Sequence, residues 1–155
     1  MAVKPIPDGC NVITPILMVA NADAVIQFLR RVFDAKEHQL ARRPDGKVWH
    51  ADLTIGGEHI MVSDASEPYL AAAAVVNVYV PDVDAAYERA IDAGATSIAA
   101  PGNRFYGDRI AVFKDPSGTT WSIATHVEDV APDELKRREA DAMRQIAAGT
   151  MSGHE

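Results

Sequence analysis

Two spacings of apolar residues recur along the chain. Alternation with a period of two is typical of strands that bury one face, and apolar residues three and four positions apart form one stripe of a helix. Helical stripes follow Asn21 and Asp82, both acceptable N-caps, and consist of Val25, Phe28, Leu29 and Val32 and of Val83, Ala86, Ala90 and Ile91. The alternating runs predict strands over residues 12–19, 37–41, 47–55, 58–63, 75–80, 96–99, 109–114 and 119–125.

The second half of this pattern repeats the first at a constant spacing, which places Val19 on Val80 and Asp23 on Asp84. Residues 115–118, Asp-Pro-Ser-Gly, suit a type I turn between two strands. Each copy has the order strand, helix and three strands. We therefore predict an α+β protein with two tandem βαβββ modules, whose curved mixed sheets surround a cavity, and with a C-terminal helix.

The repeats divide the chain into segments of one structural domain. We expect an N-terminal arm over residues 1–10, a first module over 11–64, a linker over 65–74, a second module over 75–128 and a C-terminal helix and tail over 129–155. The helix is predicted over 132–148, because Pro132 suits a first turn that also holds Asp133 and Glu134. Its thin apolar side suits packing on its own chain or across a homodimer, the assembly we expect. Residues from Gly149 onward are expected to be flexible.

Composition and charge limit the class of partner. The 155 residues are 48% hydrophobic and carry a formal net charge of −7 at pH 7. Nucleic acids and anionic membranes attract positive surfaces, so we expect neither as a partner. Cys10 is the single cysteine, which excludes an intrachain disulfide, and no apolar run reaches the roughly eighteen residues of a membrane span. These features predict a soluble, cytoplasmic protein.

Strand alternation separates the predicted sheets into two faces. One set is apolar and is expected to lie under the helices; it includes Leu17, Trp49, Leu53, Trp121 and Ile123. The opposite set mixes polar and apolar groups. It suits a ligand cavity better than a dry core, because an unpaired buried polar group costs about 1–3 kcal/mol. The predicted cavity residues are Thr14, Met18, His50, Asp52, Met61, Asn77, Tyr79, Phe105, Tyr106, Arg109, Phe113, Ser122 and His126.

Three of these residues lie in the loop that leads into the strand predicted over 109–114. Phe105 and Tyr106 suit either the mouth of a pocket or burial against the neighbouring module. Arg109, beside Asp108, suits either a clamp for a carboxylate ligand or a brace for the turn.

The tandem order and three segments resemble a known family. The segments are DVDAAYERAIDAGA, FYGDR and DPSGTTWSIATH. Over residues 11–128 the chain resembles the vicinal oxygen chelate superfamily, also called the glyoxalase/bleomycin resistance protein/dioxygenase superfamily, and the WSIATH ending is similar to a glyoxalase-like branch. The resemblance implies paired βαβββ modules around a ligand cavity. It does not select one reaction, because the family includes isomerases, lyases, dioxygenases, thiol transferases and antibiotic-sequestering proteins.

The resemblance also implies four metal-ligand positions, one in the first strand and one in the last strand of each module. Counted from the helix and turn junctions, these positions are Thr14, Met61, Val75 and Ser122. Two neutral hydroxyls, a thioether and a hydrocarbon do not form a site for a hard or borderline divalent ion. A register shifted by two residues supplies only an amide and a hydroxyl, from Ile16, Ser63, Asn77 and Ala124.

We therefore predict a protein that binds a small organic molecule, such as an antibiotic or a toxic metabolite, without metal or cofactor. One alternative is a lyase, isomerase or dioxygenase that uses a divalent metal on displaced ligands. In that enzyme His50, Asp52 or His126 holds the metal or transfers a proton. A second alternative is an interaction domain without a ligand. His38 and His59 are assigned no role.

Overall fold

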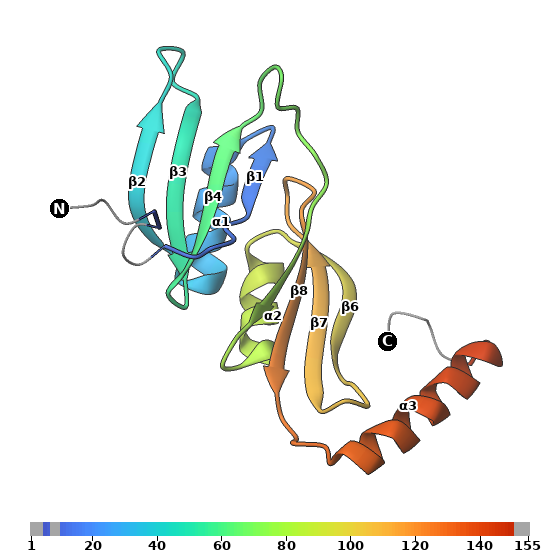
Figure 1. The fold of residues 1–155 in the computed structure, drawn as a ribbon. Coiled ribbons are helices and arrows are strands. Elements are labelled where there is room, and N and C mark those ends of the chain that lie inside the picture. The colour runs from blue at the N-terminus through green and yellow to red at the C-terminus, as the bar shows by residue number, and fades with distance from the viewer. Residues whose placement is uncertain (1–4, 7–9, 151–155) are drawn as a thin grey trace.

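The computed structural model describes residues 5–6 and 10–150, so most of the expected N-terminal arm and the end of the tail lie outside the described residues. The tandem βαβββ prediction is confirmed, with a third helix after the second module (Figure 1). The elements are β1 (Ile16–Val19), α1 (Ala22–Phe33), β2 (Lys36–Arg42), β3 (Val48–Ile55), β4 (Glu58–Asp64), β5 (Val75–Tyr79), α2 (Val83–Asp92), β6 (Thr96–Asn103), β7 (Asp108–Lys114), β8 (Thr120–His126) and α3 (Pro132–Ala147).

Each module forms one four-stranded mixed sheet. The strand order is β1-β4-β3-β2 in the first sheet and β5-β8-β7-β6 in the second. In both sheets the first strand of the module runs parallel to the last, and the other neighbours are antiparallel. Leu17 lies opposite Val62 in the first sheet, and Val78 lies opposite Ile123 in the second. This pairing leaves β1 and β5 at sheet edges.

Both predicted N-caps are confirmed. The Asn21 side chain accepts a hydrogen bond from the backbone N–H of Ala24 (3.1 Å), and the Asp82 side chain accepts one from Ala85 (3.0 Å). These bonds satisfy donors that the first helical turn leaves free. Gly94, with φ of +93°, follows α2 in the left-handed conformation that glycine adopts without strain.

The predicted turn at residues 115–118 is also confirmed. The Gly118 N–H donates to the Asp115 carbonyl at 3.0 Å. The buried Asp115 carboxylate also accepts from the indole Nε1 of Trp121 at 2.9 Å. The turn therefore fixes a fully buried tryptophan, and the prediction of Trp121 as a core residue is confirmed.

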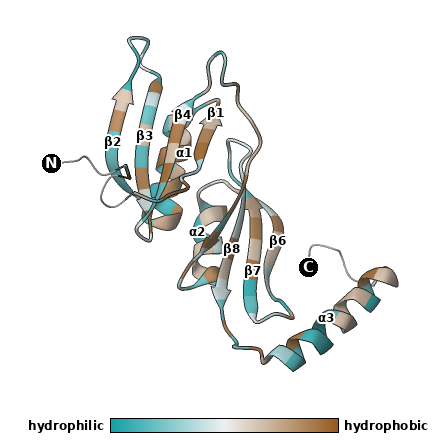
Figure 2. Cartoon of the chain, viewed as in Figure 1, coloured by the Kyte–Doolittle hydropathy of each residue, from teal (hydrophilic) through white to brown (hydrophobic). Residues whose placement is uncertain are grey.

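One continuous core joins the two modules. The ring centroids of Phe28 in α1 and Phe113 in β7 lie 6.0 Å apart, and those of Phe33 and Trp121 lie 5.2 Å apart. Figure 2 shows hydrophobic stretches along β1 and β4 and hydrophilic turns in α3. The buried core consists of Leu17, Val19, Ala22, Val25, Ile26, Phe28, Leu29, Val32, Ala35, Val48, Ala51, Leu53, Ile60, Val62, Val83, Ala86, Ala90, Ala111, Phe113, Trp121 and Ile123.

The prediction of a buried Trp49 is wrong. Trp49 is 69% exposed, whereas Val48 is fully buried. The register between β2 and β3 shifts at this point, because Ala41 lies opposite His50 and Arg42 lies opposite Val48. Trp49 is therefore the extra residue of a bulge. A bulge interrupts the alternation of side chains, so the two-residue period fails at this position.

The linker between the modules runs beside β1. The Ala72 N–H donates to the Met18 carbonyl (3.2 Å), and the Ala65 N–H donates to the Val19 carbonyl (2.8 Å). Further along the linker, Tyr69 is 68% exposed. The linker thus adds a wall beside the first sheet.

The predicted C-terminal helix is confirmed as α3, which extends away from the two sheets in Figure 1. Arg138 anchors its beginning through contacts with Glu128 (2.8 Å) and Glu134 (2.7 Å). Ala142 is buried, but Met143 on the next position is half exposed. No helix in the described part of the chain is both long enough and apolar enough to cross a bilayer.

Candidate functional site

A hollow of about 440 Å³ lies on the face of the first sheet that is opposite α1. Met18 of β1 and His50 of β3 contribute to its floor, and Trp49 and Tyr69 supply two aromatic walls. The bulge that exposes Trp49 therefore also directs it to this hollow. We call it the first-sheet hollow; its lining residues are Ile16, Met18, Arg43, Trp49, His50, Ser63, Asp64, Ser66 and Tyr69.

The guanidinium of Arg43 is incompletely paired in this hollow. Its Nε atom is buried and makes no hydrogen bond within the described residues. The nearest carboxylate, Asp45, lies 3.7 Å away, which is an ion-pair distance but too long for a hydrogen bond. A buried donor without an acceptor is costly, so this atom is suited to an acceptor that a ligand would bring.

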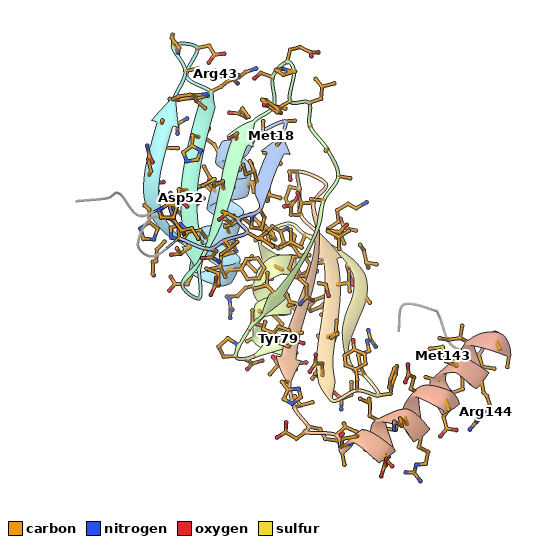
Figure 3. The ribbon with its side chains drawn as sticks, viewed as in Figure 1. Met18, Arg43, Asp52, Tyr79, Met143 and Arg144 are labelled. Atoms are coloured by element: carbon orange, nitrogen blue, oxygen red, sulfur yellow. The ribbon has the colours of Figure 1, made fainter. Side chains whose placement is uncertain are left out.

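A histidine cluster lies on the same face of the first sheet. Asp52 Oδ1 lies 2.8 Å from Nδ1 of His59, and both side chains are mostly buried. His38 Nε2 lies 3.0 Å from the Thr54 hydroxyl, and the rings of His38 and His59 are 5.3 Å apart. Figure 3 shows Asp52 and Met18 at different heights of this sheet.

Sequence reasoning missed this cluster, because it considered Asp52 with His50 along one strand. The partner of Asp52 is instead His59 on the neighbouring strand β4. The sequence feature that could have revealed this pairing is the Gly56-Gly57 turn. A two-residue hairpin fixes the register, and here it pairs Thr54 with His59 and brings the diagonal neighbour within reach.

The second sheet carries a different polar group on its open face. The Tyr79 hydroxyl of β5 donates to Asp108 Oδ2 at 2.6 Å. His126 Nδ1 lies 2.7 Å from the other oxygen of the same carboxylate, and His126 Nε2 lies 3.0 Å from Asp129. Asp108 is 5% exposed. The buried carboxylate thus connects a phenol on the open face to an imidazole at the end of β8.

These contacts shift three pKa values. Burial raises the pKa of Asp108, but the hydrogen bonds from Tyr79 and His126 outweigh it and hold that pKa below its usual value. The bonds to Asp108 and then to Asp129 raise the pKa of His126. The bond to Asp108 also raises the pKa of Tyr79. The contacts therefore favour a neutral phenol beside a charged carboxylate and imidazolium.

A groove of about 440 Å³ lies where the first module meets β5. Asn77 and Tyr79 form its wall on the second module, and His59 contributes from the first. This groove joins residues from both histidine-containing groups, although His126 and His50 are absent from its lining. The sequence-predicted cavity residues are therefore distributed over two sheets and more than one hollow.

Two predicted cavity residues, Phe113 and Arg109, lie on the helix side of the second sheet, so the assignment of Phe113 to the open face is wrong. Phe113 is fully buried and packs against Phe28. Arg109 binds Asp84 of α2 through Nε (2.7 Å) and Nη2 (2.8 Å). Of its two proposed roles, Arg109 takes the bracing one. The strand 109–114 mixes polar and apolar residues in both alternating sets, so its sequence does not identify the buried face.

The other predicted residues lie near the open faces or their ends. Thr14 precedes β1 and is half-buried, Met61 lies opposite Ile16, and Ser122 lies opposite Asn77. The rings of Phe105 and Tyr106 pack edge to face at 5.1 Å in the turn between β6 and β7. Tyr106 is 39% exposed, so one member of this aromatic pair is open to solvent.

The four positions that the family resemblance assigns to a metal do not fit one. Thr14 and Ser122 carry hydroxyls, Met61 a thioether and Val75 no donor. Val75 is also 78% exposed at a sheet edge. In residues 5–6 and 10–150, no three His, Cys, Asp or Glu side chains converge into a group suited to a metal ion. The donor chemistry at these positions is unsuited to a divalent metal.

The amino-acid sequence has relatives in mycobacteria. The uncharacterized protein Rv0887c of Mycobacterium tuberculosis (strain ATCC 25618 / H37Rv) is 36% identical over 135 residues, which cover 80% of this chain and 79% of that protein. The uncharacterized protein Mb0911c of Mycobacterium bovis is also 36% identical over 135 residues, with 80% of this chain and 89% of that protein covered.

Solved structures share the fold. TioX from Micromonospora sp. ML1 has a TM-score of 0.65 and 28% identity, covering 76% of this chain and 99% of its own. A glyoxalase/bleomycin resistance protein/dioxygenase family enzyme from Burkholderia phytofirmans PsJN has a TM-score of 0.61 and 24% identity, covering 74% and 97%. The family model described as Glyoxalase/Bleomycin resistance protein/Dioxygenase superfamily matches residues 11–123. The chain therefore belongs to the glyoxalase/bleomycin resistance protein/dioxygenase superfamily.

Proposed function

We propose that this protein binds a small organic molecule in the first-sheet hollow and that binding needs no metal ion. The observation that carries this proposal is the buried Nε of Arg43, which lacks an acceptor in the described residues, in a hollow with walls from Trp49 and Tyr69. Small-molecule sites combine a mainly apolar lining with a few directed polar groups, and the hollow has this composition.

The lining favours one chemical class of ligand. Trp49 and Tyr69 offer flat rings to a planar or aromatic body, and Met18 offers a polarisable floor. The Arg43 guanidinium suits a carbonyl or carboxylate oxygen, which accepts its unused hydrogen bond. An aromatic antibiotic or a toxic aromatic metabolite with such an oxygen fits this description.

We further propose that a second copy of the chain covers the open faces. Large apolar residues are exposed along the free edges of both sheets: Ile13 is 82%, Ile16 58% and Val75 78% exposed. Exposed apolar edge strands associate readily, and natural proteins cover or charge them. In a two-fold dimer, the second copy covers these exposed apolar residues.

We also propose that neither nucleic acid nor an anionic membrane is a partner of this protein and that it is cytoplasmic. The net charge of −7 disfavours nucleic acid and anionic membranes as partners. Cys10 is exposed and has no second cysteine to pair with, so a reducing compartment such as the cytoplasm suits the protein.

Tryptophan fluorescence tests ligand binding. Because Trp49 is exposed and Trp121 is fully buried, a ligand in the hollow should change only the red-shifted part of the emission. A panel of aromatic carboxylic acids and quinones is titrated against the wild type and against Arg43→Gln. We expect at least one compound to quench saturably and to bind about tenfold more weakly to Arg43→Gln, as expected for a lost hydrogen bond to a charged group.

Arg144→Gln is the matched control, because Arg144 lies on α3, far along the chain from the hollow, and pairs only with Asp141 among described carboxylates. Its affinity should equal that of the wild type. Failure of every compound to quench Trp49, together with a native mass spectrum that shows no retained small molecule, would contradict the proposal and favour an interaction domain.

Two further measurements address the metal and the dimer. Elemental analysis of protein purified without chelators should give no stoichiometric divalent metal. A stoichiometric metal that disappears in the double variant His50→Ala, His126→Ala would instead favour a metal-dependent enzyme. Light scattering after gel filtration should give twice the mass of one chain, whereas the mass of a single chain would contradict the two-copy arrangement.

A further inference from the structure

A groove lies between the modules, and its lining residues differ from those of the first-sheet hollow. It has a volume of about 640 Å³ and is bounded by the end of α1, the β3–β4 hairpin and the end of β5. It shares no lining residue with the hollow. We call it the inter-module groove; its lining residues are Arg30, Arg31, Val32, Phe33, Asp34, Lys36, Thr54, Ile55, Gly56, Gly57, Tyr79, Val80, Pro81 and Arg89.

The rim of this groove is cationic, although the chain as a whole is acidic. Arg30 pairs with Glu37 and Lys36 pairs with Asp34, so these two cations are largely compensated. Arg31 is different, because no carboxylate of the described residues lies within ion-pair distance of it.

Arg89 is the second uncompensated cation. Its guanidinium donates through Nε (3.2 Å) and Nη2 (3.1 Å) to the Val32 carbonyl, which holds the side chain across the boundary between the modules. A backbone carbonyl does not neutralise the charge, and Nη1 keeps its donors for another acceptor. Within the described residues, the groove therefore presents two guanidinium groups without carboxylate partners.

The floor of the groove is apolar. Phe33, Ile55 and Val80 are partly buried and pack against the core from the two modules. Tyr79 adds a ring that is 62% exposed. At the hairpin, Gly56 and Gly57 carry no side chains, and the positions of their missing Cβ atoms face open space. The backbone thus leaves room above the floor for a ligand of drug size.

We propose that the inter-module groove binds a small amphipathic organic anion. Its carboxylate, phosphate or sulfonate group contacts Arg31 and Arg89, and its apolar body lies on Phe33 and Val80. A polyanion such as nucleic acid is a poor occupant, because the net charge of −7 repels it outside the groove. This site is independent of the proposed function, since the two hollows share no residue.

A matched pair of probes separates the charge from the apolar body. The anionic probe is 8-anilinonaphthalene-1-sulfonate, and the neutral probe is N-phenyl-1-naphthylamine, which has the same ring system without the sulfonate. Each is titrated into uniformly ¹⁵N-labelled full-length protein. We expect the anionic probe to shift the amide signals of Gly56 and Gly57 saturably, without shifting the indole signal of Trp49 in the other hollow.

Charge reversal then tests the two-guanidinium model. Arg31→Glu should weaken the anionic probe about tenfold and leave the neutral probe unchanged, because Coulomb attraction acts only on the charged ligand. Arg144→Glu makes the same change of charge on α3 and should leave both affinities within about twofold. Raising the salt concentration should weaken only the anionic probe.

Three outcomes would overturn this assignment: equal affinities for the two probes, no saturable shift at Gly56 and Gly57, or a shift confined to the Trp49 indole. If Arg31→Glu does not give a folded spectrum, Arg31→Gln replaces it, because Arg31 is exposed and no ion pair ties it to the part of the chain that the structure describes. The mapping on the wild-type protein stands without either variant.

Discussion

The two modules of this protein share one topology, but their open faces differ. On the helix side, β1 and β4 pair Leu17 with Val62, and β5 and β8 pair Val78 with Ile123. On the open side, the first module has a hollow with aromatic walls and a separate histidine cluster, whereas the second has a phenol, a buried carboxylate and an imidazole in one hydrogen-bonded chain. Packing restricts the buried centre of the helix side to apolar residues, whereas the open side is free to vary.

Equivalent aspartates in the two modules form ion pairs with arginines on non-equivalent strands. Asp23 near the start of α1 binds Arg42 of β2, and Asp84 near the start of α2 binds Arg109 of β7. In each module the pair ties the first turn of the helix to the sheet. The repeat therefore preserves the contact, although the strand that supplies the cation has changed.

The ends of β4 and β8 differ in a second way. Asp64 of β4 is buried and accepts hydrogen bonds from the backbone N–H groups of Ala22 (2.9 Å) and Val48 (2.7 Å). Thr125 occupies the corresponding place in β8, and its hydroxyl donates to the Val80 carbonyl at 2.9 Å. A carboxylate thus accepts hydrogen bonds at the end of β4, whereas a hydroxyl donates one at the end of β8.

The two tryptophans give the largest expected contrast. Trp121→Ala should reduce the free energy of unfolding by about 3–5 kcal/mol, because it removes a fully buried ring and its bond to Asp115. Trp49→Ala should change that free energy by less than about 0.5 kcal/mol, since the residue is 69% exposed. Urea denaturation followed by circular dichroism measures both, and equal losses would contradict the assignment of Trp49 to an open face.

The sequence predicted the βαβββ order because helix stripes, caps and turn residues act over a few neighbouring positions. Asn21, Asp82 and the turn at 115–118 each have the hydrogen bonds expected of them. Trp49 was misplaced because one inserted residue in β3 changes the face, and local alternation does not reveal a bulge.

The candidate site was harder to predict from the sequence than the fold, because it depends on contacts between strands. The pairing of Asp52 with His59 follows from the register of β3 and β4, and the role of Asp108 as a link between Tyr79 and His126 requires three strands to be placed. The buried Nε of Arg43 lacks a hydrogen-bond partner because of the segments that surround it in three dimensions. The residue pattern of a single strand does not predict a buried donor without a partner.

The second contrast lies at the ends of β4 and β8. Asp64→Ala should cost about 3 kcal/mol of unfolding free energy, because two buried backbone donors lose a charged acceptor. Thr125→Val should cost about 1 kcal/mol, the usual contribution of one neutral hydrogen bond. Urea denaturation again provides the values. A larger loss for Thr125→Val than for Asp64→Ala would reverse the proposed difference between the modules.

The third contrast is the pH response of the second module. The pKa of His126 is raised in the folded state, so its contribution to stability is complete below the unfolded pKa of about 6.5 and is lost as the pH rises through the folded pKa. The pKa of Asp108 is lowered, so its contribution is complete above about pH 3.9 and is lost as the pH falls through the folded pKa.

An NMR titration of the His126 imidazole checks the direction of its pKa shift. We expect a midpoint above 6.5 in the wild type and a downward shift in Asp108→Asn, because Asp108 is the main cause of the raised pKa. Asp129→Asn is the graded control and should lower the midpoint by less. A midpoint that stays in place in both variants would show that the carboxylates do not hold the imidazolium.

The smallest expected contrast concerns the two arginine pairs at the helix starts. Arg42→Gln and Arg109→Gln should each lower the urea midpoint only slightly, because the four side chains are 32–53% exposed and salt screens exposed pairs. The double variant should show the sum of the two changes, since the pairs share no partner. Arg109 also contacts Asn103 at 3.0 Å, so Asn103→Ala separates that contact from the ion pair. If high salt leaves the loss for Arg109→Gln unchanged while it removes the loss for Arg42→Gln, then the brace in the second module works through hydrogen-bond geometry and the one in the first through charge.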